Sequence, residues 1–305
     1  MFRAFSLAAA GAAFLLAVLG SWVRINGAGM TCPDWPLCHG RLVPALEGGV
    51  ILEWGHRMVA FLVGFLVLGA LLAAWRERDR VAGIRPVMIA IGAVFVLQVL
   101  LGGITVFVAN SPWSVVLHWA AAMLFIAALS ALAILAAVRP RTIAIRHSVL
   151  GGALTVAAVL AFTVMCAGAY VSSSNAGLSC TTLPLCNGSV LGETAWQSAQ
   201  MIHRLLAGVF FLVATYCAYA AAFGTTARVR VATLFGFALI VLQVMLGFAN
   251  VAWSMPMVLR EAHAANAAAT FLAFVAAVVF AALDGTAPQP ARATPPSVLS
   301  LSKDS

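Results

Sequence analysis

Four histidines are the residues of this sequence best suited, by type and spacing, to do chemistry. They form two pairs, His56 with His118 and His203 with His263, and each lies near the same end of a long apolar stretch. Two imidazoles at one depth on neighbouring helices can bind the iron of a flat macrocycle from both sides. A single histidine in an apolar helix more often only forms a hydrogen bond, but four in repeated register favour ligation. The pattern therefore predicts one haem-sized site in each half of the chain.

Glu53 is the next candidate, because it precedes His56 by three residues and shares its helix face. The matching position in the second half is Gln200. A carboxylate can move protons or stabilise positive charge where a neutral amide cannot. This asymmetry suggests chemistry in the first half and a permanent cofactor in the second. Alternatively, Glu53 is only a helix-start carboxylate or the i,i+4 partner of Arg57.

Arg57 and Arg204 each follow a histidine of these pairs directly. Their guanidinium groups could bind a haem propionate through paired hydrogen bonds, or extend toward lipid headgroups. The sequence favours the two interpretations equally.

Two cysteine pairs share one spacing, Cys32 with Cys38 and Cys180 with Cys186. Both lie in polar connections that we expect to face outward, where disulfides persist, so we predict two disulfides. A shared four-thiolate zinc centre is the alternative, although zinc knuckles usually place their cysteines closer together. A zinc site at the histidines is also less favoured, because two imidazoles leave too few ligands for a tetrahedral centre.

Four further polar residues have simpler interpretations. His39 and His147 have no counterpart at the repeat spacing, and we expect both to be ordinary exposed residues. Gln98 and Gln243 lie deep in apolar stretches and are expected to form hydrogen bonds between helices.

The elements that must position these residues are membrane-spanning helices. The chain has 305 residues, 63% hydrophobic and 9% charged, and its mean hydropathy is +1.04. A soluble domain cannot bury so much apolar surface, and a helix needs about 20 mostly apolar residues to cross a bilayer. Eight stretches qualify: 4–23, 54–75, 86–108, 114–138, 147–170, 201–222, 231–252 and 260–283.

The charged residues predict the orientation of these helices. A net charge of +8 could indicate nucleic-acid binding. However, 12 of the 17 Lys and Arg residues fall on one side of the expected membrane: Arg3, Arg76, Arg78, Arg80, Arg85, Arg139, Arg141, Arg146, Arg228, Arg230, Arg292 and Lys303. By the positive-inside rule both termini are cytoplasmic and the loops 24–53 and 171–200 face outward. We therefore expect a lipid bilayer around the protein and no nucleic-acid partner.

The ends of the chain need separate interpretation. The first stretch could be a cleaved signal peptide, with Arg3 before it and small residues around Gly20. Its apolar run is longer than a signal core and its counterpart at 147–170 lies mid-chain, so we expect a retained helix. Residues 284–305 are rich in Pro, Ser and Ala and predict a disordered cytoplasmic tail.

The two halves of the sequence align with each other. The cysteine loops match at an offset of 148 residues, the His-Arg pairs at 147, and His118 with His263 at 145. Such a small drift indicates a duplicated unit of four helices, and an even number of spans inserts both copies the same way up. We therefore predict an all-α integral membrane protein, with eight transmembrane helices arranged as two parallel-repeat four-helix bundles. The first bundle covers residues 1–140 with loop 24–53, and the second covers 141–283 with loop 171–200.

Two motifs resemble the bacterial haem A synthase family in its cysteine-containing form. The first reads GAGMTCPDWPLCHG over residues 27–40 and is followed by Glu53-Trp54-Gly55-His56-Arg57. In the second half, SNAGLSC at 174–180 and PLCNG at 184–188 fit as well. The resemblance covers about residues 10–283, and it is the combination of motifs that makes it specific.

This resemblance implies a membrane enzyme that oxidises the C8 methyl group of haem O to the formyl group of haem A for terminal oxidase biogenesis. It implies two successive hydroxylations, after which a geminal diol loses water. It also implies a bacterial cell membrane location, haem O delivered by a haem O synthase, and an electron donor that the sequence does not identify. Assembly into a homo-oligomer stays open.

Transferred position by position, the resemblance also implies residue roles. His56 and His118 would hold the substrate haem O, and His203 and His263 would ligate a haem b cofactor that relays electrons. Glu53 would be the catalytic carboxylate. Cys32 and Cys38 would be the functionally important cysteine pair.

Two other functions compete when the residues alone are considered. A dihaem b-type cytochrome that takes electrons from quinol would need two permanent haems, and the difference between Glu53 and Gln200 weighs against it. A transporter built from parallel repeats would carry ionisable groups or broken helices near the middle of the membrane. Here the imidazoles and charges cluster at the helix ends.

Overall fold

The computed structural model describes residues 1–143 and 148–284. Within these ranges the chain is helical apart from its loops, and two isolated bridges are the extent of its β-structure. The elements are α1 (Phe2–Ile25), α2 (Gly49–Glu77), α3 (Ile84–Phe107), α4 (Pro112–Val138), α5 (Val149–Ser173), the short 3₁₀ helix η1 (Ala176–Leu178), α6 (Ala195–Gly224), α7 (Ala227–Ala252) and α8 (Met257–Asp284).

Each predicted stretch corresponds to one of these helices, and the largest differences are at the starts of two helices, which begin five and six residues earlier than expected. Helix α2 begins at Gly49 instead of 54, and α6 begins at Ala195 instead of 201. Thr194 caps α6 through a reciprocal pair of hydrogen bonds with Gln197, which accounts for its early start. The extensions place Glu53 and Gln200 inside helices. His147 and the predicted tail beyond Asp284 lie outside the described residues.

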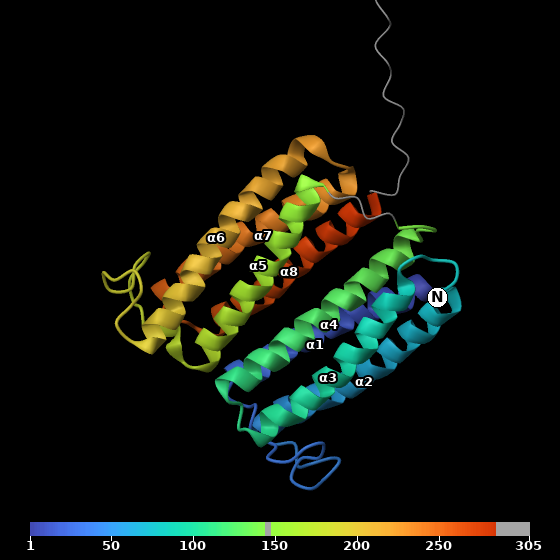
Figure 1. Cartoon of the computed structure of the whole chain (residues 1–305). Helices are drawn as coiled ribbons and strands as arrows, with labels where there is room; N and C mark the ends of the chain where they lie inside the picture. The colour runs from blue at the N-terminus through green and yellow to red at the C-terminus, as the bar shows by residue number, and fades with distance from the viewer. Residues whose placement is uncertain (144–147, 285–305) are drawn as a thin grey trace, which may run out of the picture.

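The helices pack as two sets (Figure 1). Helices α1 to α4 lie together, α5 to α8 lie together, and the sets meet where α4 contacts α5 and α8 and where α1 contacts α8. Buried apolar side chains run through both sets, among them Met123 of α4 and Phe274 of α8. The repeat relation between the two sets stays a prediction.

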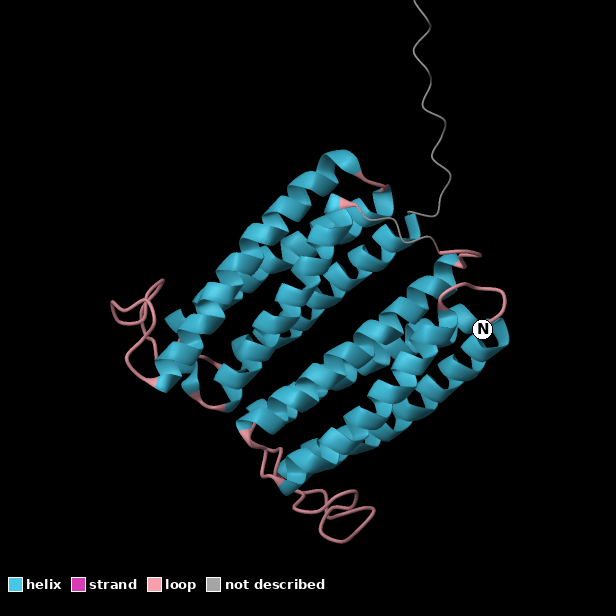
Figure 2. Cartoon of the chain, in the orientation of Figure 1, coloured by secondary structure: helices cyan, strands magenta, loops and turns pink. Residues whose placement is uncertain are grey.

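The long loops that carry the cysteines project from one end of the helices, and the N-terminus lies at the other end (Figures 1 and 2). At the N-terminal end the connections hold ion pairs. Arg139 pairs with Glu77 at 2.7 Å, and Arg85 pairs with Asp79. Both cysteine loops can therefore reach the same side of a membrane.

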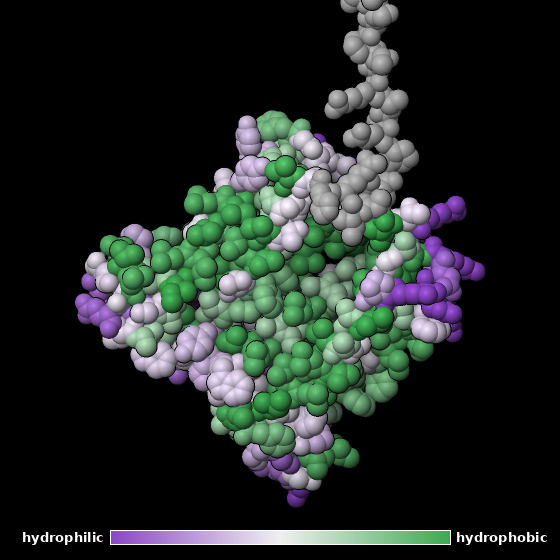
Figure 3. All heavy atoms as spheres, viewed as in Figure 1, coloured by the Kyte–Doolittle hydropathy of each residue, from purple (hydrophilic) through white to green (hydrophobic). Residues whose placement is uncertain are grey.

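The outer surface of the helices is apolar over the face shown in Figure 3. Large side chains such as Phe61 and Leu212 are 63% and 70% exposed. Exposing apolar surface to water costs about 25 cal/mol per Å², so this surface requires lipid. Within the described ranges, eight helices are long and apolar enough to cross a membrane. The protein is a multi-pass membrane protein, as the sequence predicts.

Candidate functional site

The structure brings the first predicted histidine pair together. His56 projects from α2 and His118 from α4, and the two imidazoles lie close enough to interact electrostatically. The His56 ring packs against Gly20 of α1, where an added Cβ would lie 2.8 Å from Cε1. The His118 ring packs against Gly102 of α3 at a corresponding distance of 3.3 Å. Each imidazole therefore lies against a glycine of a neighbouring helix.

The second pair has the same arrangement. His203 of α6 packs against Gly168 of α5, and His263 of α8 packs against Gly247 of α7. The corresponding Cβ to Cε1 distances are 2.9 and 3.5 Å. Nδ1 of His203 also lies 3.1 Å from the carbonyl oxygen of Val164.

Amide side chains link the helices beside both pairs, as predicted for Gln98 and Gln243. Nε2 of Gln98 lies 3.4 Å from Nε2 of His118. Nε2 of Gln243 donates to the carbonyl of His263 at 3.0 Å, and its Oε1 accepts from Nδ2 of Asn266 at 2.6 Å. The histidine-bearing helices α4 and α8 are thus tied to α3 and α7.

The four imidazoles fit the role of haem ligands. The Nδ1 atoms of His56, His118 and His263 are buried and have no hydrogen-bond partner in the part of the chain that the structure describes. Buried polar atoms normally have a partner, and a neutral imidazole nitrogen is a common metal ligand. In His203 the Val164 carbonyl favours a proton on Nδ1, which leaves the Nε2 lone pair available.

Two imidazoles are all that such a site requires from the protein. Within residues 1–143 and 148–284, no group of three or more His, Cys, Asp or Glu side chains is placed to hold a metal ion. The iron of a haem takes its remaining ligands from the macrocycle.

Glu53 is buried at the start of α2 and accepts hydrogen bonds from three groups. Its Oε1 pairs with Arg57 at 2.7 Å. Its Oε2 accepts from the Thr31 hydroxyl at 3.0 Å and from the Cys32 N–H at 2.9 Å. The i,i+4 ion pair that the sequence offered as an alternative role is therefore present. Glu53 also ties the cysteine loop to the helix that carries His56.

Gln200 occupies the corresponding place in the second half. Its Oε1 accepts from the Ser179 hydroxyl at 3.0 Å and from the Cys180 N–H at 2.9 Å. Its Nε2 donates to the carbonyl of Gly177 at 2.8 Å. The loops thus present the same kinds of donor to both side chains, and the two networks differ chiefly in having a carboxylate or an amide at their centre.

Arg57 and Arg204 bind the cysteine loops. Nη1 of Arg57 donates to the carbonyls of Asp34 and Leu37 at 2.7 and 2.6 Å. Nη1 of Arg204 donates to the carbonyl of Thr182 at 2.8 Å. These contacts give the arginines that follow His56 and His203 a structural role in holding the loops. Propionate binding by either residue stays a prediction.

Both predicted disulfides are present, Cys32–Cys38 and Cys180–Cys186. All four cysteines are buried. The disulfides close the loops beside Glu53 and Gln200, because the N–H groups of Cys32 and Cys180 are the ones that those side chains bind.

The first cysteine loop is also organised by Asp34. Its carboxylate accepts the N–H groups of Gly40 and His39, each at 2.7 Å. These two hydrogen bonds, the first more than the second, hold the pKa of Asp34 below its ordinary value. His39 is exposed, as expected, and its Nε2 lies 2.9 Å from the carbonyl of Thr31.

Two residues that lie at the site, Gly20 and Thr31, were not identified as site residues from the sequence. Gly20 suggested a cleavage signal there, whereas it lies against His56 in the structure. Thr31 belonged only to a loop motif, yet its hydroxyl contacts Glu53. The repeat offset of 148 residues could have indicated both, because it relates Gly20 to Gly168 and Thr31 to Ser179.

Comparison with known proteins identifies the family. The sequence profile of COX15-CtaA, described as cytochrome oxidase assembly protein, matches residues 3–275. The chain belongs to this family. It is 34% identical over 221 residues to a protein of Symbiobacterium thermophilum named Heme A synthase, a match that covers 67% of this chain and 70% of that protein.

Other relatives of the same name extend the comparison. The Heme A synthase of Bacillus licheniformis is 27% identical over 255 residues, which cover 80% of this chain and 84% of that protein. The Heme A synthase of Bacillus pumilus is 29% identical over 206 residues and 63% of this chain, and the match spans 66% of that protein's length. The COX15-CtaA profile spans all four histidines and both cysteine loops. The resemblance noted in the sequence is confirmed, and the comparisons give no support to a quinol-linked dihaem cytochrome.

Proposed function

We propose that this COX15-CtaA protein is a haem A synthase, which oxidises the C8 methyl group of haem O to the formyl group of haem A for terminal oxidase biogenesis. Family membership and the names of its relatives support this activity. The observation that carries the proposal is the buried carboxylate of Glu53 in a network whose counterpart holds the amide of Gln200. A protein with two equivalent permanent haems would not need this difference.

In this proposal the four histidines bind and orient the two haems. His56 and His118 hold the substrate haem O, and His203 and His263 ligate haem b. When bound, haem b supplies a one-electron redox centre. Gly20 and Gly168 allow the His56 and His203 rings to lie close to α1 and α5.

Glu53 takes up and returns a proton one helical turn from His56. The hydroxyl of Thr31 is suited to both protonation states, because it lies 3.0 Å from Oε2 and 2.9 Å from the carbonyl of Ala28. A hydroxyl has one hydrogen to donate and can also accept. It can donate to the ionised carboxylate, or turn to Ala28 and accept from the protonated one. The hydrogen bond between Thr31 and Glu53 can therefore be kept whether the carboxyl group is ionised or protonated.

The cellular location and the partners follow from the same proposal. The protein resides in the bacterial cell membrane with both termini in the cytoplasm and both cysteine loops outside. Haem O arrives from a haem O synthase, and a donor of unidentified chemistry supplies electrons. Arg57 and Arg204 serve first to hold the loops.

Pigment analysis of the purified protein, with and without a supply of haem O, tests the activity. Haem b together with haem O or haem A is the expected composition. Two haem b per chain, unchanged when haem O is supplied, would identify a dihaem cytochrome. A protein that binds no haem would exclude both functions.

A further inference from the structure

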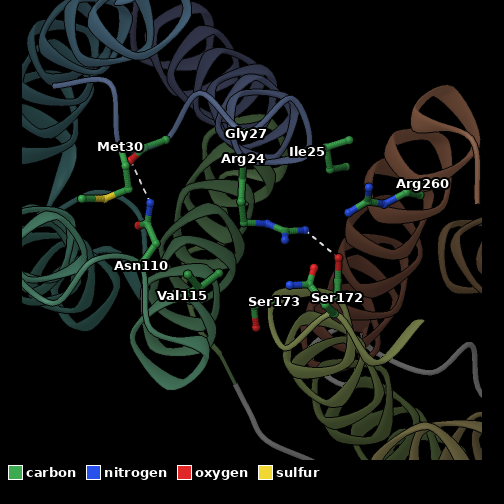
Figure 4. Close-up of a pocket in the computed structure, with 11 residues that line it drawn as sticks. Arg24, Ile25, Gly27, Met30, Asn110, Val115, Ser172, Ser173 and Arg260 are labelled. Carbon is green, nitrogen blue, oxygen red and sulfur yellow. Dashed lines mark hydrogen bonds between the residues drawn. The ribbon is translucent and has the colours of Figure 1, made fainter. Parts of the chain in front are cut away.

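A pocket of about 350 Å³ lies between the two helix sets, at the end that carries the cysteine loops. Its walls come from the end of α1, the start of α4, the end of α5 and the start of α8 (Figure 4). Ligand pockets begin at about 300 Å³, so this pocket suits a headgroup-sized ligand. None of the four histidines lines it.

Two guanidinium groups converge on this pocket. Arg24 of α1 and Arg260 of α8 point into the space between the sets (Figure 4). Nη2 of Arg24 donates to the hydroxyl of Ser172 at 2.7 Å. The Arg260 side chain makes no hydrogen bond or ion pair to the described residues, and its charge acts on Arg24.

The charge of the pocket is only partly balanced. The charge of Glu261 acts on Arg24, but Glu261 does not line the pocket, and no carboxylate stands among the lining residues beside the two guanidinium groups. Both arginines are half-buried, and two like charges removed from water repel each other more strongly than exposed ones. An anion between the guanidinium groups would relieve this repulsion.

The pocket is lined by positions that correspond between the two halves. At the offset of 148 residues Arg24 corresponds to Ser172, and at the offset of 145 Val115 corresponds to Arg260. Each half thus contributes one arginine, from a different helix, and the corresponding residue of the other half is neutral. The two positive charges therefore stand at positions that do not correspond to each other in the repeat, and both line the pocket between the sets.

We propose that this pocket binds an oxyanion, and that its occupant is the phosphate of an anionic phospholipid. Guanidinium groups offer paired N–H donors that match phosphate oxygens. In a membrane the loop end of the helices lies at headgroup depth, where guanidinium groups attract the phosphates of anionic lipids. Ile25, Met30 and Val115 add apolar wall beside the charges. The bound phosphate bridges α1 to α8 and so joins the two sets.

Native mass spectrometry of the purified full-length protein with added phosphatidylglycerol or phosphatidylcholine tests this site. The unmodified protein should retain phosphatidylglycerol in preference to phosphatidylcholine. Retention should fall about tenfold in Arg260→Gln, because a charge-assisted contact is lost. Arg41→Gln is the matched control, since Arg41 is an exposed arginine of the outward cysteine loop, and its retention should stay unchanged.

A second variant and a second anion complete the test. Ser173→Asp leaves both arginines in place but adds a carboxylate to the pocket wall, and it should also lose phosphatidylglycerol. In phosphatidylcholine nanodiscs, a rise in Tm with inorganic phosphate that Arg260→Gln lacks would support the same oxyanion site filled from water. Equal phosphatidylglycerol retention by the unmodified protein, Arg260→Gln and Ser173→Asp would overturn the proposal. No haem conversion is measured, so the result is independent of the proposed enzyme activity.

Discussion

The imidazole of His56 lies so close to Gly20 that a Cβ at position 20 would fall 2.8 Å from Cε1. His203 and Gly168 have the same relation, at 2.9 Å. Distances this short are not found between real Cβ atoms and their neighbours, whereas the 3.3 Å at Gly102 is merely tight and the 3.5 Å at Gly247 is ordinary contact. The first helix pair of each set therefore constrains its histidine most strongly.

Alanine substitution at these glycines should disturb haem binding in the order of the distances. In Gly168→Ala the new methyl group must rotate or push the His203 ring. We expect haem b content to fall about tenfold, as for other residues that orient a metal ligand. Gly20→Ala should weaken haem O retention in the same way, and Gly247→Ala should be tolerated. The measurements are haem content and the absorption spectrum of the purified variants.

Two glycines on the same helices serve as controls. Gly152 of α5 and Gly11 of α1 have open space where a Cβ would go. Alanine is a better helix former than glycine by about 1 kcal/mol, so Gly152→Ala and Gly11→Ala should bind haem normally. Equal haem loss in controls and test variants would show that the substitutions disturb helix packing and not the orientation of the imidazoles.

Glu53→Gln should reduce haem A formation without reducing haem binding. Gln200 makes the corresponding loop contacts through its amide oxygen, so the variant should fold and keep both haems. Loss of a general acid or base costs about 10²- to 10⁴-fold in rate, and haem A formation should fall by that order. A normal haem A yield in a variant with a full haem complement would exclude the catalytic role of Glu53.

Arg57→Ala should loosen the first cysteine loop. The substitution removes donors to three loop carbonyls and to the carboxylate of Glu53. Hydrogen bonds to charged groups contribute about 1.5–3 kcal/mol each, so Tm should fall and the Cys32–Cys38 disulfide should become easier to reduce. Arg204→Ala should have a smaller effect, because its loop contacts are more exposed. Unchanged Tm and unchanged disulfide protection in Arg57→Ala would contradict this role.

The same loop should open in acid because of Asp34. The N–H groups of Gly40 and His39 hold the pKa of Asp34 below its ordinary value, so its carboxylate stabilises the folded loop. This contribution is complete above the unfolded pKa, about 3.9, and is lost as the pH falls through the lower folded value. The protection of the Gly40 and His39 amides from hydrogen exchange, relative to their intrinsic exchange rates, should therefore fall below about pH 4. In Asp34→Asn exchange should be fast and show no such pH step. A step of the same size in that variant would assign it to another group.

Much of the architecture could be predicted from the sequence. A bilayer requires about 20 apolar residues per helix, so hydropathy alone located all eight spans, with no boundary more than six residues from that of the helix. The repeat offsets paired His56 with His203 and Glu53 with Gln200 before any packing was known. The spacing of apolar stretches and repeated motifs along the chain carries this information, because the lipid bilayer requires a similar apolar length of every span.

The tertiary structure determined what those residues contact. The hydrogen bonds of Glu53 to Thr31 and Cys32 depend on how the loop folds back over α2. The close approach of Gly20 to His56 depends on how α1 rotates against α2. Arg24 and Arg260 meet only because the two helix sets pack at α1 and α8. Sequence spacing fixes the position of a side chain along its own helix, but helix rotation and loop path set its neighbours, and these arise from packing across the whole chain.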